Sequence, residues 1–430
     1  MSCIPDSFIG LNLEATPRLA SRSRPYQVLE RGIVLAYSMV IISAFFLATG
    51  CAETESLEIV EKQFSFPDAP NIVFLTSFGS QDDINPPSEF RKWLLGRDAF
   101  ASDQAVNKPY GIATSKGKVF INDGRQLSGY WSYDLEKKEM RLIQDRSLFG
   151  SLGIAVDTRG YKYFSVPLLL EAKEKGTFGS KDEKGRIVVF NEKDELVKKG
   201  DFPGRPIEVA VHGDRLYITD GANHQVAVVD KNTLQVLKTI GNQGDGDSEF
   251  NFPKSIAVGE NGTIYVGDLF NGRVKVFDRE GAFISQYGYR SRLLGGFINL
   301  TGLGVDLDEL VYAVDYGYAQ KISGDEVQIF DAKKFYRKGE KVPSLESKGK
   351  KKNALYGYFQ RPFGLGKTGQ ASFGTAGLYA PVDIAIDYEN VEYFKKYQKP
   401  GTRFKYLIWL TSQFAANGRN VSLFAYTVEN

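Results

Sequence analysis

Four aspartates share the same local context, because each stands at the end of a short run rich in Val, Ile, Leu, Tyr or Phe. They are Asp123, Asp220, Asp268 and Asp315. Gathered around one axis, such carboxylates could hold a divalent cation such as calcium through oxygen ligands. Short acidic side chains at strand ends also accept backbone N–H groups of the following turn. A site is normally built from unlike residues, so the repetition favours the structural role, and we predict no cofactor and no metal here.

Other side chains suited to catalysis are few. The sequence contains 2 histidines, His212 and His224, whereas a histidine-ligated zinc or copper centre needs more imidazoles that converge. The segment 244–250, Gly-Asp-Gly-Asp-Ser-Glu-Phe, looks superficially like a calcium loop but lacks the ligand spacing and length of an EF-hand. No nucleophile elbow, phosphate loop or paired catalytic motif stands out. We therefore predict no catalytic residue.

Two stretches are basic and aromatic together. They cover residues 333–352 and 393–405, and the candidate partner-binding residues in them are Lys350, Lys351, Lys352, Lys395 and Lys396. These lysines belong either to solvated loops or to docking surfaces for lipid phosphates or an acidic protein. The formal net charge of +2 gives no general case for nucleic acid.

The N-terminal segment 1–50 indicates export. Arg31 precedes an apolar run, residues 32–47, which is too short for a comfortable membrane span and is typical of a signal-peptide core. The run ends in Leu-Ala-Thr-Gly-Cys51, which resembles a bacterial lipobox and implies that Cys51 is acylated and becomes the mature N-terminus. An uncleaved anchor helix with a chance cysteine is the alternative. Ala52 after the cysteine favours the outer over the inner membrane, and residues 51–67 form a tether.

The fold follows from a repeat, for which residues 252–288 are the template. Four short runs rich in Val, Ile, Tyr and Phe are separated by Asn-Gly and Glu-Gly turn signals, which predicts a four-stranded antiparallel meander. One meander cannot bury both faces alone, so it needs copies. A first-strand triplet with a small central residue recurs at Ala113, Ala155, Ala210, Ala257, Gly304 and Ala385. Near the axis of a ring of sheets only small side chains fit, so the pattern predicts an all-β, six-bladed propeller over residues 68–430.

The predicted blades cover residues 108–142, 148–199, 205–241, 252–288, 300–335 and 381–428. An insertion at 168–184 in the second blade is expected to be a mobile loop. Residues 71–79 form an apolar strand that ends like the outer strand of a blade, although no first strand precedes it. We predict that this strand completes the sixth blade, so that both ends of the propeller share one sheet.

This repeat resembles the NHL-repeat family of β-propellers, most closely at residues 252–288, and the Asn223-His224 pair matches the family's name. The resemblance implies that residues 244–250 are an inter-blade linker whose aromatic residue tucks under the next blade. Together with the lipobox-like segment and the absence of catalytic motifs, the resemblance leads us to expect a cell-envelope lipoprotein whose monomeric, non-enzymatic propeller acts as a protein-binding or scaffolding module, with no nucleic-acid partner. Two alternatives stay open because fold does not imply function. One is a secreted propeller hydrolase or lyase with a divalent metal in the central channel. The other is an accessory subunit of an outer-membrane transport or electron-transfer complex.

Overall fold

The computed structural model describes residues 71–86, 105–123, 128–167, 184–291, 295–316, 326–332, 345–347, 350–352, 359–363, 380–413 and 418–429. All of them belong to one compact unit, Phe66–Asn430. The segment predicted as signal peptide and tether, Cys51, and residues 168–183 of the predicted insertion lie outside the described residues. No helix in the described part of the chain is both long and apolar enough to cross a membrane.

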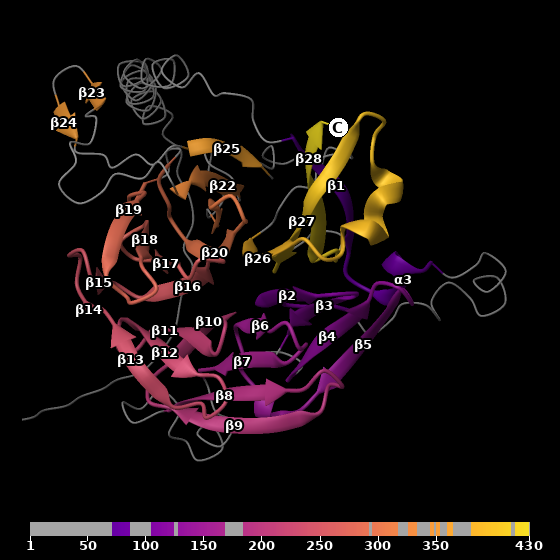
Figure 1. Ribbon diagram of the computed structural model, residues 1–430, viewed down its shortest axis with the longest axis horizontal. Helices are drawn as coiled ribbons and strands as arrows, with labels where there is room; N and C mark the ends of the chain where they lie inside the picture. The colour runs from indigo at the N-terminus through magenta and orange to yellow at the C-terminus, as the bar shows by residue number, and fades with distance from the viewer. Residues whose placement is uncertain are drawn as a thin grey trace, which may run out of the picture. The chain divides into compact units, whose positions relative to one another are not determined.

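Six four-stranded antiparallel sheets follow one another around a ring (Figure 1). Blades one to three use strands that are consecutive in the chain. Blade one holds β2 (Gly111–Ser115), β3 (Lys118–Asn122), β4 (Gly129–Asp134) and β5 (Glu139–Gln144). Blade two holds β6 (Ile154–Val156), β7 (Lys162–Val166), β8 (Gly185–Phe190) and β9 (Leu196–Phe202). Blade three holds β10 (Pro206–His212), β11 (Arg215–Asp220), β12 (Gln225–Asp230) and β13 (Val236–Ile240).

Blade four also uses consecutive strands, whereas blades five and six do not. Blade four holds β16 (Pro253–Val258), β17 (Ile264–Asp268), β18 (Arg273–Phe277) and β19 (Phe283–Tyr287), after a small pair of β14 (Asn242–Gln243) and β15 (Glu249–Phe250). Blade five holds β20 (Leu300–Val305), β21 (Leu310–Asp315), β22 (Glu326–Asp331) and β25 (Phe359–Phe363). Blade six holds β26 (Pro381–Asp387), β27 (Thr402–Ser412), β28 (Val421–Glu429) and β1 (Asn71–Phe78). Short helices are α3 (Gln81–Ile84), η2 (Arg146–Leu148) and η4 (Val391–Tyr397).

The ring closes as predicted, because β1 is the outer strand of blade six. It pairs antiparallel with β28, from Asn71 opposite Thr427 to Phe78 opposite Val421. Phe78 is buried and meets Trp409 of the same blade with ring centroids 6.4 Å apart. The first described strand in the chain is therefore held by the last one through both backbone pairing and apolar packing.

One predicted boundary is wrong. Blade five was expected to end near residue 335, but its outer strand is β25, where Phe363 lies opposite Val327 of β22. The chain between these strands contains the separate hairpin of β23 (Leu345–Ser347) and β24 (Lys350–Lys352).

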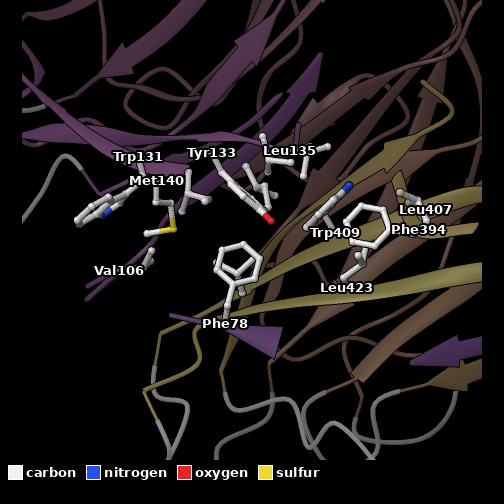
Figure 2. Close-up of a cluster of buried hydrophobic side chains, with 14 of the residues drawn as sticks. Phe78, Val106, Trp131, Tyr133, Leu135, Met140, Phe394, Leu407, Trp409 and Leu423 are labelled. Carbon is white, nitrogen blue, oxygen red and sulfur yellow. The ribbon is translucent and has the colours of Figure 1, made fainter. Parts of the chain in front are cut away.

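The core consists of hydrophobic clusters between neighbouring blades. One lies between blades one and six and includes Trp131, Tyr133, Trp409 and Leu423 (Figure 2). The recurrent small residues belong to these interfaces and do not point at open space on the axis. A Cβ added to Gly304 of blade five would lie 3.2 Å from an Ile386 carbon of blade six, which is tighter than ordinary contact. Close approach of adjacent first strands thus explains the small residue.

The first strands form an inner ring in which each contacts the next, in the order β2, β6, β10, β16, β20, β26 and back to β2. Polar side chains join the blades near this ring by donating to carbonyls of the next first strand. They are Asn122 to Leu152 (2.7 Å), Ser165 to Ile207 (2.6 Å), Thr219 to Lys254 (3.2 Å) and Thr301 to Pro381 (3.0 Å). Each bond satisfies a buried polar group, so the inner ring is fixed by hydrogen bonds as well as packing.

Candidate functional site

The four recurrent aspartates lie in four different blades, and each is buried. Each accepts a backbone N–H from the loop that leads into its own first strand, so it ties the start of the first strand to the end of the second. The pairs are Asn107 to Asp123 (2.9 Å), Arg205 to Asp220 (2.9 Å), Asn251 to Asp268 (2.6 Å) and Asn299 to Asp315 (2.8 Å). These contacts are those of a carboxylate that caps backbone amides.

The histidines make separate backbone contacts in or beside blade three. His212 Nε2 lies 2.9 Å from the carbonyl oxygen of Glu260, and His224 Nδ1 accepts the N–H of Phe252 at 2.9 Å. Within the described residues, no group of three or more His, Cys, Asp or Glu side chains could hold a metal ion.

The loop that looks like a calcium site surrounds a cation of the protein itself. Lys275 of β18 donates from its ammonium group to the carbonyls of Gly246, Asp247 and Glu249, at 2.9 Å for Asp247. Burial lowers the pKa of Lys275 to about 8. Phe250, at the end of the loop, is fully buried and packs on Phe277 with ring centroids 5.6 Å apart. The segment therefore joins two blades as the resemblance implied.

The predicted partner-binding lysines lie in two places. Lys395 and Lys396 are exposed on η4, where Lys395 forms an ion pair with Glu392 at 2.6 Å. The ammonium of Lys396 stands 4.9 Å from the ring centre of Tyr397. Lys350, Lys351 and Lys352 form β24, and their side chains lie outside what the structure describes. The structure does not show one common surface for the two groups.

Sequence reasoning missed a group of charged side chains on the inner ring. We call Glu208 of β10, Lys254 of β16 and Asp383 of β26 the axial cluster. Blades three and six stand opposite each other in the ring, yet the charge of Asp383 acts on Glu208, and both carboxylates act on Lys254. The three side chains therefore converge on the axis from three blades.

Hydrogen bonds and close packing fix the carboxylates of the axial cluster. Glu208 Oε1 accepts the N–H of Val209 at 3.2 Å, and an added Cβ at Gly153 of blade two would collide with the same oxygen. Asp383 Oδ2 accepts the N–H of Ile112 in blade one at 2.9 Å. Each carboxylate thus leans toward a neighbouring blade, and glycine at position 153 makes the space for one of them.

Burial shifts all three pKa values toward neutrality. It raises the pKa of Asp383 to about 7, although the N–H of Ile112 and the charge of Lys254 both lower this pKa. It also raises the pKa of Glu208 well above the usual value, and the charge of Asp383 adds to this. Burial lowers the pKa of Lys254 to about 8, although both carboxylates oppose the change. Glu208 and Lys254 keep partial contact with water, but the crowding by protein atoms sets the direction of their shifts.

A signal for the axial cluster was present in the repeat. The position just before the small-residue triplet holds Gly111, Gly153, Glu208, Ser255, Gly302 and Asp383 in the six blades. Only blades three and six place a charge there. Sequence reasoning considered only the triplets themselves and not this position. The charged residues that two blades carry there are the signal for the axial cluster.

The structure contains six four-stranded sheets, and β1 from the start of the described chain closes the ring by pairing with β28. This arrangement defines the class of the protein as a six-bladed β-propeller. A family model described as a 6-bladed beta-propeller, DUF5128, matches residues 201–321. The chain is a six-bladed β-propeller, and a short segment of it is similar to NHL repeat-containing proteins.

Curated relatives match over short segments. NHL repeat-containing protein 2 of Bos taurus is 37% identical over 81 residues, which is 17% of this chain and 11% of that protein. A probable peptidyl-alpha-hydroxyglycine alpha-amidating lyase of Caenorhabditis elegans is 32% identical over 74 residues, 16% of this chain and 21% of its own length. The chain thus spans only a small part of the curated relatives that it matches.

Solved structures are similar at low identity. Hydrazine synthase of Kuenenia stuttgartiensis has a TM-score of 0.42 and 13% identity, covering 74% of this chain and 80% of that one. A virginiamycin B lyase of Staphylococcus aureus has a TM-score of 0.40 and 11% identity, covering 74% and 94%.

Proposed function

We propose that this protein is a lipid-anchored binding module of the cell envelope, whose propeller recognises a protein partner through the axial cluster. The observation that carries the proposal is the charge placed at one repeated position in blades three and six, where three other blades have glycine. In a repeat protein, residues needed by the fold recur in each unit, whereas a binding site breaks the repeat.

The energetics agree with a role outside folding. Burying ionisable groups is unfavourable, and replacing buried ion pairs by apolar residues of similar size is often neutral or stabilising. The glycines at the equivalent positions indicate that the inner ring does not require a charge there. We infer that Glu208 and Asp383 are retained to bind an amine of the ligand, while Lys254 faces a carbonyl or carboxylate. A lysine side chain or chain terminus of a peptide segment has this chemistry.

Co-purification from detergent-solubilised membranes tests the proposal. Wild-type protein should retain its partner, and a Glu208→Gln, Asp383→Asn double variant should lose it. Lys199→Met, an exposed change on β9, is the matched control and should behave as wild type. If the double variant keeps the partner and charge reversal at Lys350–Lys352 or Lys395–Lys396 releases it, the axial site is wrong and the basic segments are the docking surface.

Anchoring and location are part of the same proposal. Cys51 would carry the lipid, residues 51–67 would form the tether, and the outer membrane is the expected location. A long tether would let the propeller reach a partner beyond the headgroup layer.

A second candidate function is acid–base catalysis at the axial cluster. Groups with pKa values of about 7 and about 8, as for Asp383 and Lys254, suit proton transfer near neutral pH. The short match to a probable lyase is a reason to test for lyase activity. Incubation with a peptidyl-α-hydroxyglycine should show turnover that Lys254→Met removes if the protein is an enzyme of that kind. No turnover by the wild type would count against this candidate and leave the binding proposal intact.

A further inference from the structure

A pocket lies where blade six meets blade one, apart from the axial cluster. It has a volume of about 140 Å³ and is lined by residues of β1, α3, β4, η4 and β27 together with the turn that follows β4. We call it the seam pocket. A cavity of about 150 Å³ is large enough for one benzene ring. Its size therefore suits a single-ring ligand.

Aromatic side chains form the walls of the seam pocket. Phe78 lies 5.3 Å from Tyr133 and 6.4 Å from Trp409, and Phe394 lies 5.6 Å from Trp409, measured between ring centroids. All three contacts are edge-to-face. Figure 2 shows the four rings gathered from segments that are distant in the chain. A further ring could add the same edge-to-face or offset contacts.

The walls are held in place by polar contacts that point away from the pocket. Trp409 donates from its indole N–H to Asp387 at 2.9 Å. Gln81 of α3 clamps the helix to blade one, since it donates to the carbonyl of Lys138 at 2.9 Å and accepts the N–H of Met140 at 2.6 Å. The pocket is thus largely preformed, as is usual for small-molecule sites.

The polar residues that line the seam pocket are two lysines, three tyrosines, one threonine and one acid. Lys138 and Lys396 line it and are exposed. Burial raises the pKa of Tyr133 to about 12, with the neighbouring Tyr397 adding to the effect, so this hydroxyl keeps its proton. Asp83 is the one acid among the described lining residues, and it is already engaged. Its Oδ2 accepts the N–H of Gly79 at 2.9 Å, and its Oδ1 pairs with Arg419 at 3.0 Å.

From this geometry we propose that the seam pocket binds a small aromatic carboxylate, with its ring among Phe78, Tyr133 and Trp409 and its carboxylate at Lys138 and Lys396. The ring adds to the aromatic lining, and the carboxylate brings a negative charge to a pocket that two lysines line. A sugar fits less well, because it brings no charge for these lysines and the one lining carboxylate, Asp83, is already engaged. A cationic ligand fits less well because two ammonium groups line the pocket.

Calorimetric titration of the full-length protein with benzoate tests the proposal. Benzylamine is the charge control, cyclohexanecarboxylate the ring control and glucose the sugar control. Benzoate should bind with a dissociation constant of about a millimolar or tighter, as expected for so small a ligand. Each control should bind at least about tenfold more weakly, since losing the charged hydrogen bond or the ring contacts removes a factor of that size.

Variants at exposed lysines assign the site without risk to folding. Lys138→Met and Lys396→Met should each weaken benzoate binding about tenfold. Lys137→Met is the matched control, because Lys137 is a neighbour that pairs with Asp134 at 3.5 Å outside the pocket, and it should leave the affinity unchanged. Equal binding of benzoate and benzylamine, preference for glucose, no benzoate binding, or affinity insensitive to both lysines would each overturn the proposal. Its failure would not touch the axial cluster, which none of these variants changes.

Discussion

Replacing Asp383 by asparagine should stabilise the protein at neutral and alkaline pH. The pKa of Asp383 is raised from 3.8 to about 7, so the folded state disfavours the ionised form. Well below pH 3.8 the carboxyl is protonated in both states and contributes nothing. As the pH rises from 4 to 7 the unfolded chain releases this proton more readily, so unfolding becomes easier. Above pH 7 the penalty is complete.

The size follows from the shift. A difference of 7 − 3.8, about 3 pKa units, corresponds to about 4 kcal/mol at about 1.4 kcal/mol per unit. The amide oxygen of the substituted side chain could still accept the N–H of Ile112, but the side chain would carry no charge to bury. We therefore expect Asp383→Asn to raise the free energy of unfolding by roughly 2–4 kcal/mol at pH 8, and by less than about 1 kcal/mol at pH 4.

Urea denaturation of the purified protein at pH 4 and pH 8 measures this difference. Asp201→Asn is the matched control, since its exposed carboxylate pairs with Arg186 on the surface and should change stability by less than about 0.5 kcal/mol at either pH. A destabilised Asp383→Asn protein at pH 8, or the same difference at both pH values, would show that the buried charge is not the controlling factor.

Four further outcomes are expected. Mass spectrometry should find Cys51 acylated, and Cys51→Ser should shift the protein out of the membrane fraction; an unmodified Cys51 in an intact N-terminal peptide contradicts this. A chain that lacks residues 1–79 should have a lower melting temperature than the full-length protein and an unfolding free energy lower by several kcal/mol, because β28 loses its pairing and packing. Equal melting temperatures would refute this prediction. Lys275→Met should lower the unfolding free energy by about 2 kcal/mol in urea titrations, since it leaves loop carbonyls unsatisfied; an unchanged midpoint would mean that water replaces the ammonium. Charge reversal at Lys350–Lys352 or Lys395–Lys396 should weaken partner binding and its salt dependence if these lysines contribute to docking; binding that keeps the wild-type salt slope would exclude them.

The repeat made the blades predictable, because strand alternation and turn residues recur with a fixed order. Closure by β1 was predictable for the same reason: Asn71–Phe78 matches an outer strand that lacks its own blade. The end of blade five was not, since the chain from β22 to β25 includes the β23–β24 hairpin and departs from the repeat. A strand that follows such an insertion can be identified only once the structure shows which strand it pairs with.

The sites were harder to predict than the fold. Glu208 and Asp383 stand at a position that the repeat shows clearly, but their approach across the axis depends on blade geometry. The seam pocket is even harder to predict from the sequence, because Phe78, Tyr133 and Trp409 become neighbours only when the ring closes. Cys51, in contrast, is predicted from local sequence alone and lies outside the described structure.

The pairing of β1 with β28 also sets an order of events during synthesis. Residue 71 leaves the ribosome long before its partner Thr427, so β1 must wait while the intervening blades form. During that wait its hydrogen-bonding edge and Phe78 have no native partner, which is the condition that invites misassociation. Contacts between residues so distant in sequence also form slowly. The last strand to emerge therefore completes the ring, and until it pairs, β1 presents an open edge that can associate with other chains.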